Sequence, residues 1–406
     1  MSAPGGLIVS GSGRDPCRIA EVGIACALGR SLDAVWPRLV AGDTAAMAPA
    51  QASARAYGRV EGELPFIQAA LAPLACRNNR LAQLVFEQIA AQVAAARRRF
   101  GAPRLAVVVG TSTSGISDAE DAFRARSRTG QLAGEFALAQ LEHGGLAEFV
   151  AHLAGAQGPA YTISTACSSG AKALASARAL LELDLCDAVV AGGVDSACAL
   201  TERGFASLQA VSAGLTNPMS RNRDGLTLGE GGALFLLLRE LGGIQLAGAG
   251  ESSDAHHMSA PEPNGQGFEA CMRAALADAA LEPAEIAYVN LHGTGTPQND
   301  RVESAAVLRV FGSGVPCSST KPLVGHALGA SGALEAAFCW LLMSRRQGES
   351  LRLPPHRWDG CSDPDVAPLR LVKDGESVLA PAPAALLSNS FGFGGSNCAL
   401  VLREAS

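Results

Sequence analysis

Short apolar runs rich in β-branched residues alternate along this chain with longer stretches of helical period that are rich in alanine and leucine. The runs predict strands at residues 105–109, 188–191, 234–238 and 286–291. The longer stretches predict helices at residues 80–99, 170–183, 267–280, 301–311 and 332–346. Because alternating strands and helices pack in layers, with helices on the faces of a sheet, the pattern predicts an α/β protein.

The length of the chain leaves its domain organisation open. With 406 residues, 48% of them hydrophobic, it can form two or three ordinary domains or one large layered body. Two segments, at residues 239–250 and 354–374, are rich in glycine or proline and predict linkers. We place the midpoint at the first, which divides the chain into residues 1–240 and 241–406. No internal repeat is visible, so any duplication would be structural.

Charge, cysteine usage and hydropathy exclude several classes of protein. A net charge of -6 and an aromatic content of 5% argue against a nucleic-acid partner. The eleven cysteines are scattered, unlike a disulfide framework, and favour a reducing cytoplasm. The first residues do not resemble an export signal, and the longest apolar runs, at 233–238 and 336–343, are too short to span a bilayer. We therefore expect a cytoplasmic protein without membrane insertion.

Cys167 lies between a β-prone run and a predicted helix, in the segment YTISTACSSG at residues 161–170. A thiol at a helix N-terminus meets the positive end of the dipole and free N–H groups, which lower its pKa and favour the nucleophilic thiolate. The alternative is a buried structural cysteine, the commoner role, which fits Cys186, Cys198 and Cys339. Cys167 is thus a candidate nucleophile that needs partners.

His292 belongs to a second segment, YVNLHGTGTPQND at residues 288–300, which runs from a predicted strand into a glycine-containing loop. Such a loop can bring its backbone and two threonine hydroxyls close to an extended substrate. The alternative is a turn whose histidine only caps the strand. His256 and His257 are weaker candidates, because adjacent side chains on an extended strand diverge.

Lys321 and His326 lie five residues apart in the segment SSTKPLVGHALGASGA at residues 318–333, across a proline and a glycine. A loop of this kind could aim both side chains at one point. A lysine is ordinarily a solvated surface charge. In an apolar cleft it would need a carboxylate, and Glu303, on the helix that follows His292, is the candidate.

A glycine-rich segment near the C-terminus, LSNSFGFGGSN at residues 387–397, has neither the lysine and hydroxyl of a P-loop nor the spacing of a dinucleotide fingerprint. Its glycines can expose backbone N–H groups, which suits an oxyanion hole.

Zinc binding is the alternative interpretation of Cys167, His292 and His326, since all three are possible zinc ligands. None of them sits in a short paired spacing, and Lys321 would add an unfavourable positive charge. We therefore expect no metal.

These four segments, in this order, resemble the β-ketoacyl-(acyl-carrier-protein) synthases, in particular the bacterial elongating enzymes of the Cys-His-His class. The resemblance covers almost the whole chain, including residues 17–42, 192–195, 223–225, 229–231 and 252–258. It implies the thiolase fold, an α/β structure of two pseudo-duplicated halves with layered α-β-α-β-α architecture. The half at 1–240 would carry the nucleophilic cysteine, and the half at 241–406 the catalytic histidines and lysine.

The resemblance also implies a decarboxylative Claisen condensation and a role for each catalytic residue. Cys167 would accept the acyl chain by transthioesterification. His292 and His326 would bind the malonyl thioester and activate it for decarboxylation, which develops an enolate charge. Lys321 would organise the electrostatics together with Glu303.

The remaining matched residues would bind substrate. Thr294 and Thr296 would contact the phosphopantetheine arm of the acyl carrier protein, which is the implied partner. The N–H groups of Cys167 and Phe393 would form the oxyanion hole, and Phe391 and Phe393 would gate malonyl entry. The enzyme itself would need no bound cofactor.

Some positions depart from the family. The sequence NPMS at residues 217–220 replaces a common Arg-Pro-Phe-Asp, His256 replaces a common tyrosine, and residues 1–16 form an extension. These changes leave acyl length, saturation and starter open, and we expect part of residues 111–116 to line the acyl pocket. STACSSG at 164–170 with CSST at 317–320 is more similar to synthases of bacterial polyene-type pathways than to those of housekeeping fatty-acid synthesis, and fatty-acid and polyene or polyketide biosynthesis both stay open.

Relatives are dimers, so we expect either a homodimer or a heterodimer with a related subunit. One alternative function is a non-catalytic chain-length factor, but such subunits typically lack the cysteine that this chain has. A thiolase is the other alternative, and His292 argues against it, because thiolases replace this histidine.

Overall fold

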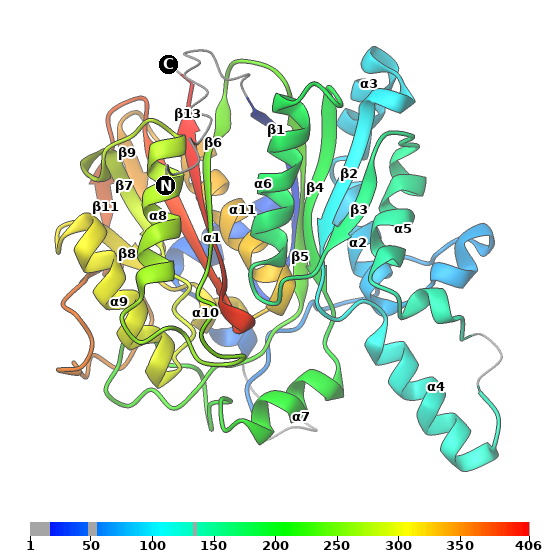
Figure 1. Cartoon of the computed structure of the whole chain (residues 1–406), viewed down its shortest axis with the longest axis horizontal. Coiled ribbons are helices and arrows are strands. Elements are labelled where there is room, and N and C mark those ends of the chain that lie inside the picture. The colour runs from blue at the N-terminus through cyan, green and yellow to red at the C-terminus, as the bar shows by residue number, and fades with distance from the viewer. Residues whose placement is uncertain (1–16, 48–54, 133–135, 406) are drawn as a thin grey trace, which may run out of the picture.

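The computed structural model describes residues 17–47, 55–132 and 136–405, so the N-terminal extension at 1–16 lies outside the described residues (Figure 1). The strands of the first half form five neighbouring strands of a mixed sheet, in the order β3 (Ala160–Ile163), β2 (Leu105–Gly110), β4 (Ala188–Asp195), β5 (Gly231–Leu238), β1 (Arg18–Ala25). β3, β2 and β4 are parallel, and β5 is antiparallel to both β4 and β1.

The second half repeats this topology. Its order is β8 (Pro316–Ser318), β7 (Ile286–Asn290), β12 (Ala385–Gly392), β13 (Ser396–Glu404), β6 (Ile244–Ser253), with the same parallel and antiparallel neighbours. β10 (Arg370–Leu371) extends the β8 edge, and β9 (Ser350–Arg352) pairs with β11 (Ser377–Leu379). In both halves the strands are ordered third, second, fourth, fifth, first along the chain. The duplication is therefore structural, and only the pair Arg18 and Gln245 joins β1 to β6.

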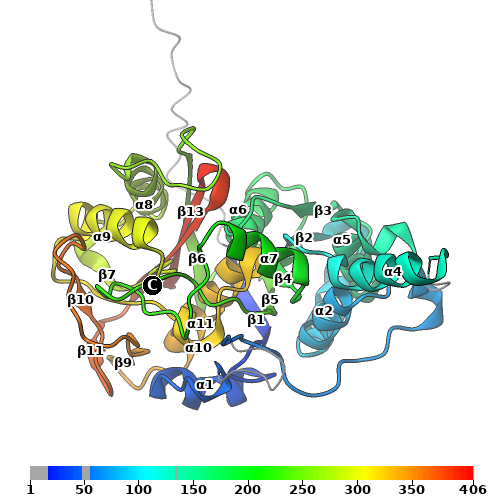
Figure 2. The ribbon, with the colours of Figure 1, turned by 90° about the horizontal axis from the view of Figure 1, so that it is seen from below.

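Helices fill three layers around the two sets of strands (Figures 1 and 2). α6 (Ser169–Glu182) and α11 (Ser331–Ser344) pack against each other between the sheets. α2 (Arg77–Glu87), α3 (Ala90–Phe100) and α5 (Gly144–Ala154) cover the outer face of the first sheet, while α8 (Gln266–Asp278) and α9 (Pro297–Phe311) cover that of the second. The order is helix, sheet, helix, sheet, helix, which confirms the predicted layered α-β-α-β-α architecture.

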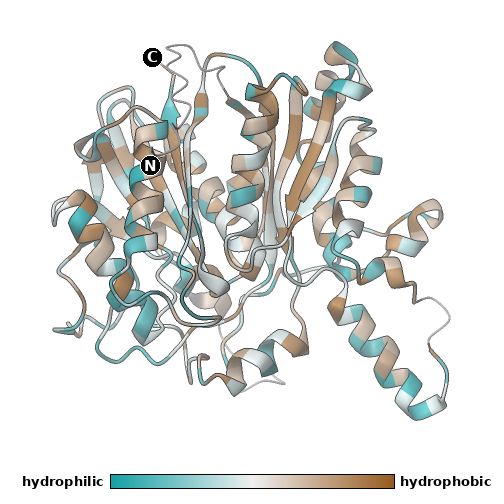
Figure 3. Ribbon diagram, in the orientation of Figure 1, coloured by the Kyte–Doolittle hydropathy of each residue, from teal (hydrophilic) through white to brown (hydrophobic). Residues whose placement is uncertain are grey.

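Hydrophobic cores separate these layers, and strand periodicity assigns each side chain to one of them. On β5, Ala233, Phe235 and Leu237 belong to the central core, whereas alternate residues Leu234 and Leu236 belong to the outer core of the first half. A third core lies under α8 and α9. Because β5 is buried on both faces, its sequence is a continuous apolar run, seen in brown in Figure 3.

The remaining helices lie outside the layers. They are α1 (Leu32–Ala41), α4 (Ile116–Thr129), α7 (Ala199–Ser207) and the short α10 (Lys321–Val324). α4 extends away from the body of the molecule (Figure 1). Within the part of the chain that the structure describes, no helix has the length and apolar character needed to cross a bilayer.

The structure corrects two predictions from the sequence. The helix predicted at 80–99 is two helices, because the backbone leaves helical geometry at Ile89, next to Gln88, whose side chain exchanges two hydrogen bonds with the backbone of Ile24 on β1. The linker predicted at 239–250 is wrong over its second part, which is the first part of β6. Gly248 and Gly250 serve close packing there, since a Cβ atom at either would lie within 2.3 Å of a carbonyl oxygen of α8.

The other predicted helices and strands are present within a few residues of their expected bounds, including β1 and α1 in the N-terminal segment 17–42. Segment 354–374 is irregular apart from β10, in line with its composition. The division into halves at residues 240 and 241 stays a prediction, and it falls between β5 and β6.

Candidate active site

Cys167 lies at a sharp turn between β3 and α6. The preceding residue, Ala166, has a φ of 54°, a left-handed conformation that is strained for a residue with a Cβ atom. The carbonyl of Ala166 accepts hydrogen bonds from the Ser169 hydroxyl at 2.6 Å, the Ser169 N–H at 3.1 Å and the Ser112 hydroxyl at 3.2 Å. These three donors hold the turn that presents the thiol.

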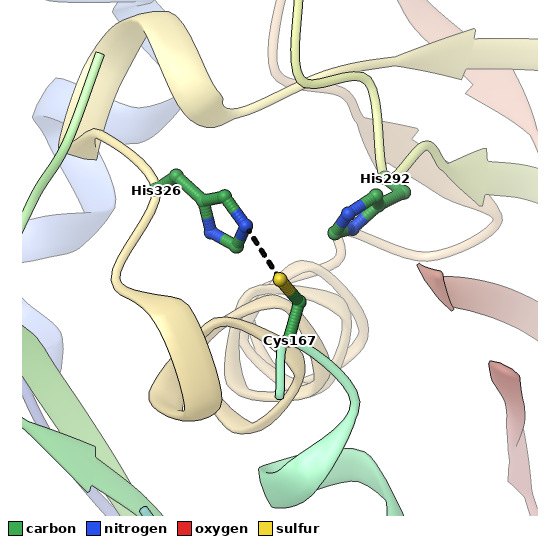
Figure 4. A group of neighbouring side chains, drawn as sticks. All are labelled: Cys167, His292 and His326. Carbon is green, nitrogen blue, oxygen red and sulfur yellow. Dashed lines mark hydrogen bonds between the residues drawn. The ribbon is translucent and has the colours of Figure 1, made fainter. Parts of the chain in front are cut away.

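His326 approaches Cys167 from the second half of the molecule (Figure 4). Its Nε2 lies 3.1 Å from the Cys167 sulfur, and its Nδ1 lies 2.8 Å from the hydroxyl of Ser331, the first residue of α11. The His326 N–H also donates to the carbonyl of Thr227 at 2.7 Å. Hydrogen bonds thus fix both the ring and the backbone of His326. A base must be held in this way within hydrogen-bond reach of the thiol from which it takes a proton.

Burial sets the protonation states of this pair. It raises the pKa of Cys167 to about 11, although the N–H of Phe393, the charge of Lys321 and the N–H of Cys167 itself act in the opposite direction. The predicted lowering of this pKa by the helix N-terminus is therefore wrong, because desolvation dominates. Burial, with Lys321, also holds the pKa of His326 well below its usual value. The resting pair is a thiol beside a neutral imidazole.

His292 faces the same point from the other side (Figure 4). Its ring is 5.3 Å from that of His326, centroid to centroid, and nearly perpendicular to it. Burial lowers the pKa of His292 well below 6.5, with further contributions from Lys321 and His326. Two neutral imidazoles therefore flank the sulfur, and each can donate one N–H.

Glu303 holds the backbone that carries His292. Its two carboxylate oxygens accept the N–H groups of His292 and Gly293, each at 2.7 Å. Asn299 donates to the same carboxylate at 3.2 Å. Burial raises the pKa of Glu303 to about 7, while these N–H groups oppose the shift.

Lys321 is fully buried, but its partner is Glu335 and not Glu303 as predicted. The ammonium group forms an ion pair with the Glu335 carboxylate and donates to the carbonyl of His292 at 2.7 Å. Burial raises the pKa of Glu335 to about 7, and Lys321 opposes this. Glu335 was missed because α10 and α11, which bring the pair together, meet only in the folded chain. The lysine-to-glutamate spacing of fourteen residues carries no such signal.

A cavity of about 440 Å³ opens onto these residues. Its lining includes Cys167, His292, His326, Thr294, Thr296, Phe391 and Phe393, so seven of the predicted residues meet at one space. The Thr294 and Thr296 hydroxyls are 2.9 Å apart. A cavity of this size with a partly apolar lining suits an extended substrate arm.

Aromatic side chains shape the cavity wall. Phe391 stacks on Phe268 with 3.7 Å between ring centroids, and Phe393 lies 5.4 Å from Phe205. Phe205 and Phe268 were missed, since an isolated phenylalanine gives no signal of its place. His257, a weak candidate by sequence, also lines this cavity.

The backbone around Phe393 supports the expected oxyanion hole. The N–H groups of Phe393 and Cys167 both interact with the Cys167 sulfur and act to lower the thiol pKa. Gly394 follows in a left-handed conformation with a φ of 81°, which a glycine adopts without strain. Two N–H groups this close to the sulfur suit an oxyanion hole for the carbonyl oxygen of a thioester formed on Cys167.

Residues 111–113 bind a buried carboxylate close to the Cys167 turn. Buried Asp195 accepts the N–H groups of Ser112 and Thr113 at 2.8 Å and the Thr111 and Thr113 hydroxyls at 2.6 and 2.8 Å. Ser112 in turn donates to Ala166. This segment therefore supports the turn, and its place in an acyl pocket stays a prediction.

The sulfur of Cys167 and nitrogens of His292 and His326 lie within 4.8 Å of one another, close enough to hold a metal ion. The donor set fits zinc poorly, because the Lys321 charge already lowers the pKa of both histidines and would repel a cation. That no metal binds stays a prediction.

Comparisons with known families and structures agree with this geometry. The family description "Beta-ketoacyl synthase, N-terminal domain" matches residues 18–241, and "Beta-ketoacyl synthase, C-terminal domain" matches 244–350. The chain is 37% identical over 279 residues to 3-oxoacyl-[acyl-carrier-protein] synthase 2 of Rhizobium meliloti, covering 61% of each. It is 34% identical over 265 residues to that of Coxiella burnetii, covering 61% of this chain and 62% of that one. The match thus spans about three fifths of these relatives' length.

Solved structures are similar over almost the whole chain. A ketosynthase in complex with its chain length factor, from Xenorhabdus doucetiae, aligns with a TM-score of 0.90 at 41% identity, covering 96% of this chain and 98% of that chain. A β-ketoacyl synthase from Burkholderia phymatum aligns with a TM-score of 0.81 at 28% identity, covering 97% and 100%. With the duplicated topology, these likenesses confirm the thiolase fold.

Proposed function

We propose that this chain, which belongs to the β-ketoacyl synthase family, is a 3-oxoacyl-(acyl-carrier-protein) synthase. It condenses an acyl group carried on Cys167 with a malonyl unit carried by an acyl carrier protein. The observation that carries the proposal is the convergence of Cys167, His326 and His292 at one cavity, with buried Lys321 behind them. The phosphopantetheine arm of the carrier is a substrate, and the chain's own side chains suffice for the chemistry.

The first step is acyl transfer to Cys167. His326 Nε2, 3.1 Å from the sulfur, takes the thiol proton as the thiolate attacks the acyl thioester. The N–H groups of Cys167 and Phe393 stabilise the tetrahedral oxyanion, and the carrier thiolate leaves with the proton from His326. Ser331 at Nδ1 can donate or accept, so the imidazole can exchange tautomers without moving.

The second step forms the carbon–carbon bond. N–H groups of neutral His292 and His326 bind the carbonyl oxygen of the malonyl thioester, where enolate charge develops as carbon dioxide leaves. The enolate carbon attacks the acyl thioester on Cys167. Collapse of the tetrahedral intermediate expels the Cys167 thiolate, which regains a proton. The acyl thioester on Cys167, one malonyl thioester and one proton give the 3-oxoacyl thioester, carbon dioxide and the free Cys167 thiol.

Replacement of Cys167 by alanine tests this assignment. Because decarboxylation uses the histidines, Cys167→Ala is expected to abolish condensation and retain release of carbon dioxide from malonyl-carrier. Product is followed by mass spectrometry of the carrier protein. Condensation by Cys167→Ala at the wild-type rate would disprove the nucleophile assignment.

A related subunit is the proposed partner. The first sheet ends at β3, which has no neighbouring strand on its outer side within the described residues, and a second subunit could extend the sheet there. The likeness to a ketosynthase solved with its chain length factor favours a heterodimer over a homodimer. Sedimentation of the chain alone at micromolar concentration, and again with a chain-length-factor subunit, separates these cases. A stable monomer in both would contradict the proposal.

The alternatives are less well supported. A non-catalytic chain-length-factor role leaves the complete set of Cys167, His292, His326 and Lys321 without a function. A thiolase would not be expected to place a histidine at position 292. We also propose a cytoplasmic location, which is supported by the eleven cysteines, all of them free thiols.

A further inference from the structure

His356 is a buried histidine that the proposed mechanism does not use. It lies in the irregular segment that follows β9, and both of its ring nitrogens have partners. Nδ1 accepts the backbone N–H of Ser319 at 3.1 Å, and Nε2 donates to the carbonyl of Pro218 at 2.9 Å. Since an N–H only donates and a carbonyl only accepts, the two bonds define one neutral tautomer. Burial agrees, lowering the pKa of His356 to about 4.

The Nδ1 bond leads to the backbone beside His292. Ser319 donates its hydroxyl to the carbonyl of Gly293 at 2.7 Å and accepts the N–H of Lys321 at 3.2 Å. A Cβ atom at Gly293 would lie 2.5 Å from that of Ser319, and Gly293 has a φ of 42°. The Ser319 side chain is therefore in direct contact with the Gly293 backbone, and a shift of Ser319 must displace residue 293.

The Nε2 bond leads to the other side of the same loop. Pro218 belongs to the NPMS segment that departs from the family, and the next N–H, of Met219, donates to Asp300 at 2.7 Å. Asp300 also accepts the N–H of Gly295 at 3.2 Å. His356 thus sits between two lines of hydrogen bonds that meet on residues 293–295.

We propose that His356 is a positioning residue for the decarboxylation step, acting through Ser319 on the Gly293 backbone and so on the placement of the His292 ring. The inference rests on the proposed function. It concerns one half of the reaction, because Cys167, His326 and Ser331 are not on this path.

Two substitutions separate the bonds of His356. In His356→Asn the side-chain oxygen is bonded to Cγ, as Nδ1 is in histidine, so it can still accept the hydrogen bond from the Ser319 N–H. The shorter asparagine side chain cannot reach the carbonyl of Pro218, so that hydrogen bond is lost. In His356→Gln the terminal amide can reach Pro218, while the acceptor for Ser319 is lost. Misplacement of a catalytic group by about 1 Å costs up to about 100-fold in rate. We expect His356→Gln to lower kcat for decarboxylation of malonyl-carrier by about tenfold or more, with KM unchanged. His356→Asn is expected to keep most of the wild-type kcat.

Acylation of Cys167, followed by intact-protein mass spectrometry, is the internal control, and both variants are expected to acylate at the wild-type rate. Ser319→Ala removes the hydroxyl bond to Gly293 directly, together with the acceptor of the Lys321 N–H, and should reproduce the loss of decarboxylation. It keeps the test decisive if His356→Gln does not fold.

Arg357→Gln is the matched control for a loosened segment. Arg357 holds the same stretch of chain to the end of α1 through the carbonyls of Gly42 and Ala41, at 2.7 and 2.5 Å, without contacting Ser319. It is expected to lower Tm without separating the two half-reactions. Equal decarboxylation by the Asn and Gln variants, or a parallel loss of acylation and decarboxylation, would overturn the positioning role. A wild-type protein that does not decarboxylate malonyl-carrier would instead contradict the proposed function.

Discussion

The two halves of the molecule share one topology and use the same loop differently. In the first half the loop after β2 is bound by Asp195, which takes the N–H groups of Ser112 and Thr113. In the second half the loop after β7 is bound by Glu303, which takes those of His292 and Gly293. Both carboxyl groups are buried, and burial raises both pKa values.

What differs is what each bound loop presents. The first presents hydroxyls that support the Cys167 turn, through Ser112 and Ala166. The second presents an imidazole to the cavity. The first half therefore supports the turn that carries the proposed nucleophile, and the second half supports His292, while His326, also from the second half, serves both steps of the proposed reaction. Lys321 belongs to both, because its charge acts on Cys167 and on both histidines.

Loss of Lys321 should therefore impair both acyl transfer and decarboxylation. Lys321→Met leaves the Glu335 carboxylate buried without its cation, which costs about 3–5 kcal/mol of unfolding free energy. Removing the charge also raises the pKa of Cys167 and of both histidines, so both half-reactions should slow. Denaturant unfolding and the two half-reaction assays measure this. Adding Glu335→Gln should recover part of the stability, and no recovery would argue against the ion pair as the cause.

The two hydrogen bonds of His356, to Ser319 and Pro218, should make the stability of the protein sensitive to acid. The pKa of His356 is about 4 in the folded protein and about 6.5 in the unfolded chain. The contribution of His356 to the free energy of unfolding is therefore present above pH 6.5 and is lost as the pH falls toward 4. The wild type should lose about 3 kcal/mol relative to His356→Asn over that window. Glu303 and Glu335, with raised pKa values, change in the opposite direction in both proteins and cancel in the difference. Parallel stability curves would contradict the buried neutral state.

Glu303→Gln should affect the second half alone. The amide replaces one carboxylate oxygen with a donor that faces a backbone N–H, so the His292 loop loses a hydrogen bond and shifts. We expect decarboxylation to fall by about 100-fold while Cys167 acylation persists. Carbon dioxide release and acyl-enzyme formation measure the two. Equal losses in both would show that the halves are not separable.

Asp195→Asn should slow the acylation of Cys167 and leave decarboxylation unchanged, with a smaller effect than Glu303→Gln has on decarboxylation. The substitution weakens the support under Ser112, which is one of three donors to Ala166. Acylation of Cys167 should slow by about tenfold with decarboxylation retained. The rate of acyl-enzyme formation is the readout, and a selective loss of decarboxylation would reverse the assignment of the two halves.

Metal removal should have the smallest effect. Treatment with a chelator, followed by the condensation assay, is expected to leave the rate unchanged, because imidazole N–H groups and Lys321 stabilise the developing charge. A loss of activity restored by zinc would show that Cys167, His292 and His326 hold an ion.

Local patterns were sufficient for part of the fold and of the candidate site. Strand runs such as residues 234–238 are continuous and apolar because both faces of β5 are buried, and this is visible without a structure. The helix break at Ile89 is not visible in this way, because the neighbouring Gln88 side chain is held by a pair of hydrogen bonds to a strand sixty-four residues away. Gly248 and Gly250 look like turn residues, and only contact with α8 shows that they serve packing.

By itself the sequence determined the α/β class and the four segments that carry Cys167, His292, Lys321, His326 and the loop at Phe393, since each motif is local and its chemistry follows from residue type. Tertiary structure alone decided which groups act on one another. It paired Lys321 with Glu335, gave Glu303 to the His292 backbone and raised the pKa of Cys167 to about 11. The physical reason is that ion pairing and desolvation depend on distance and burial, which arise only when the two halves pack together.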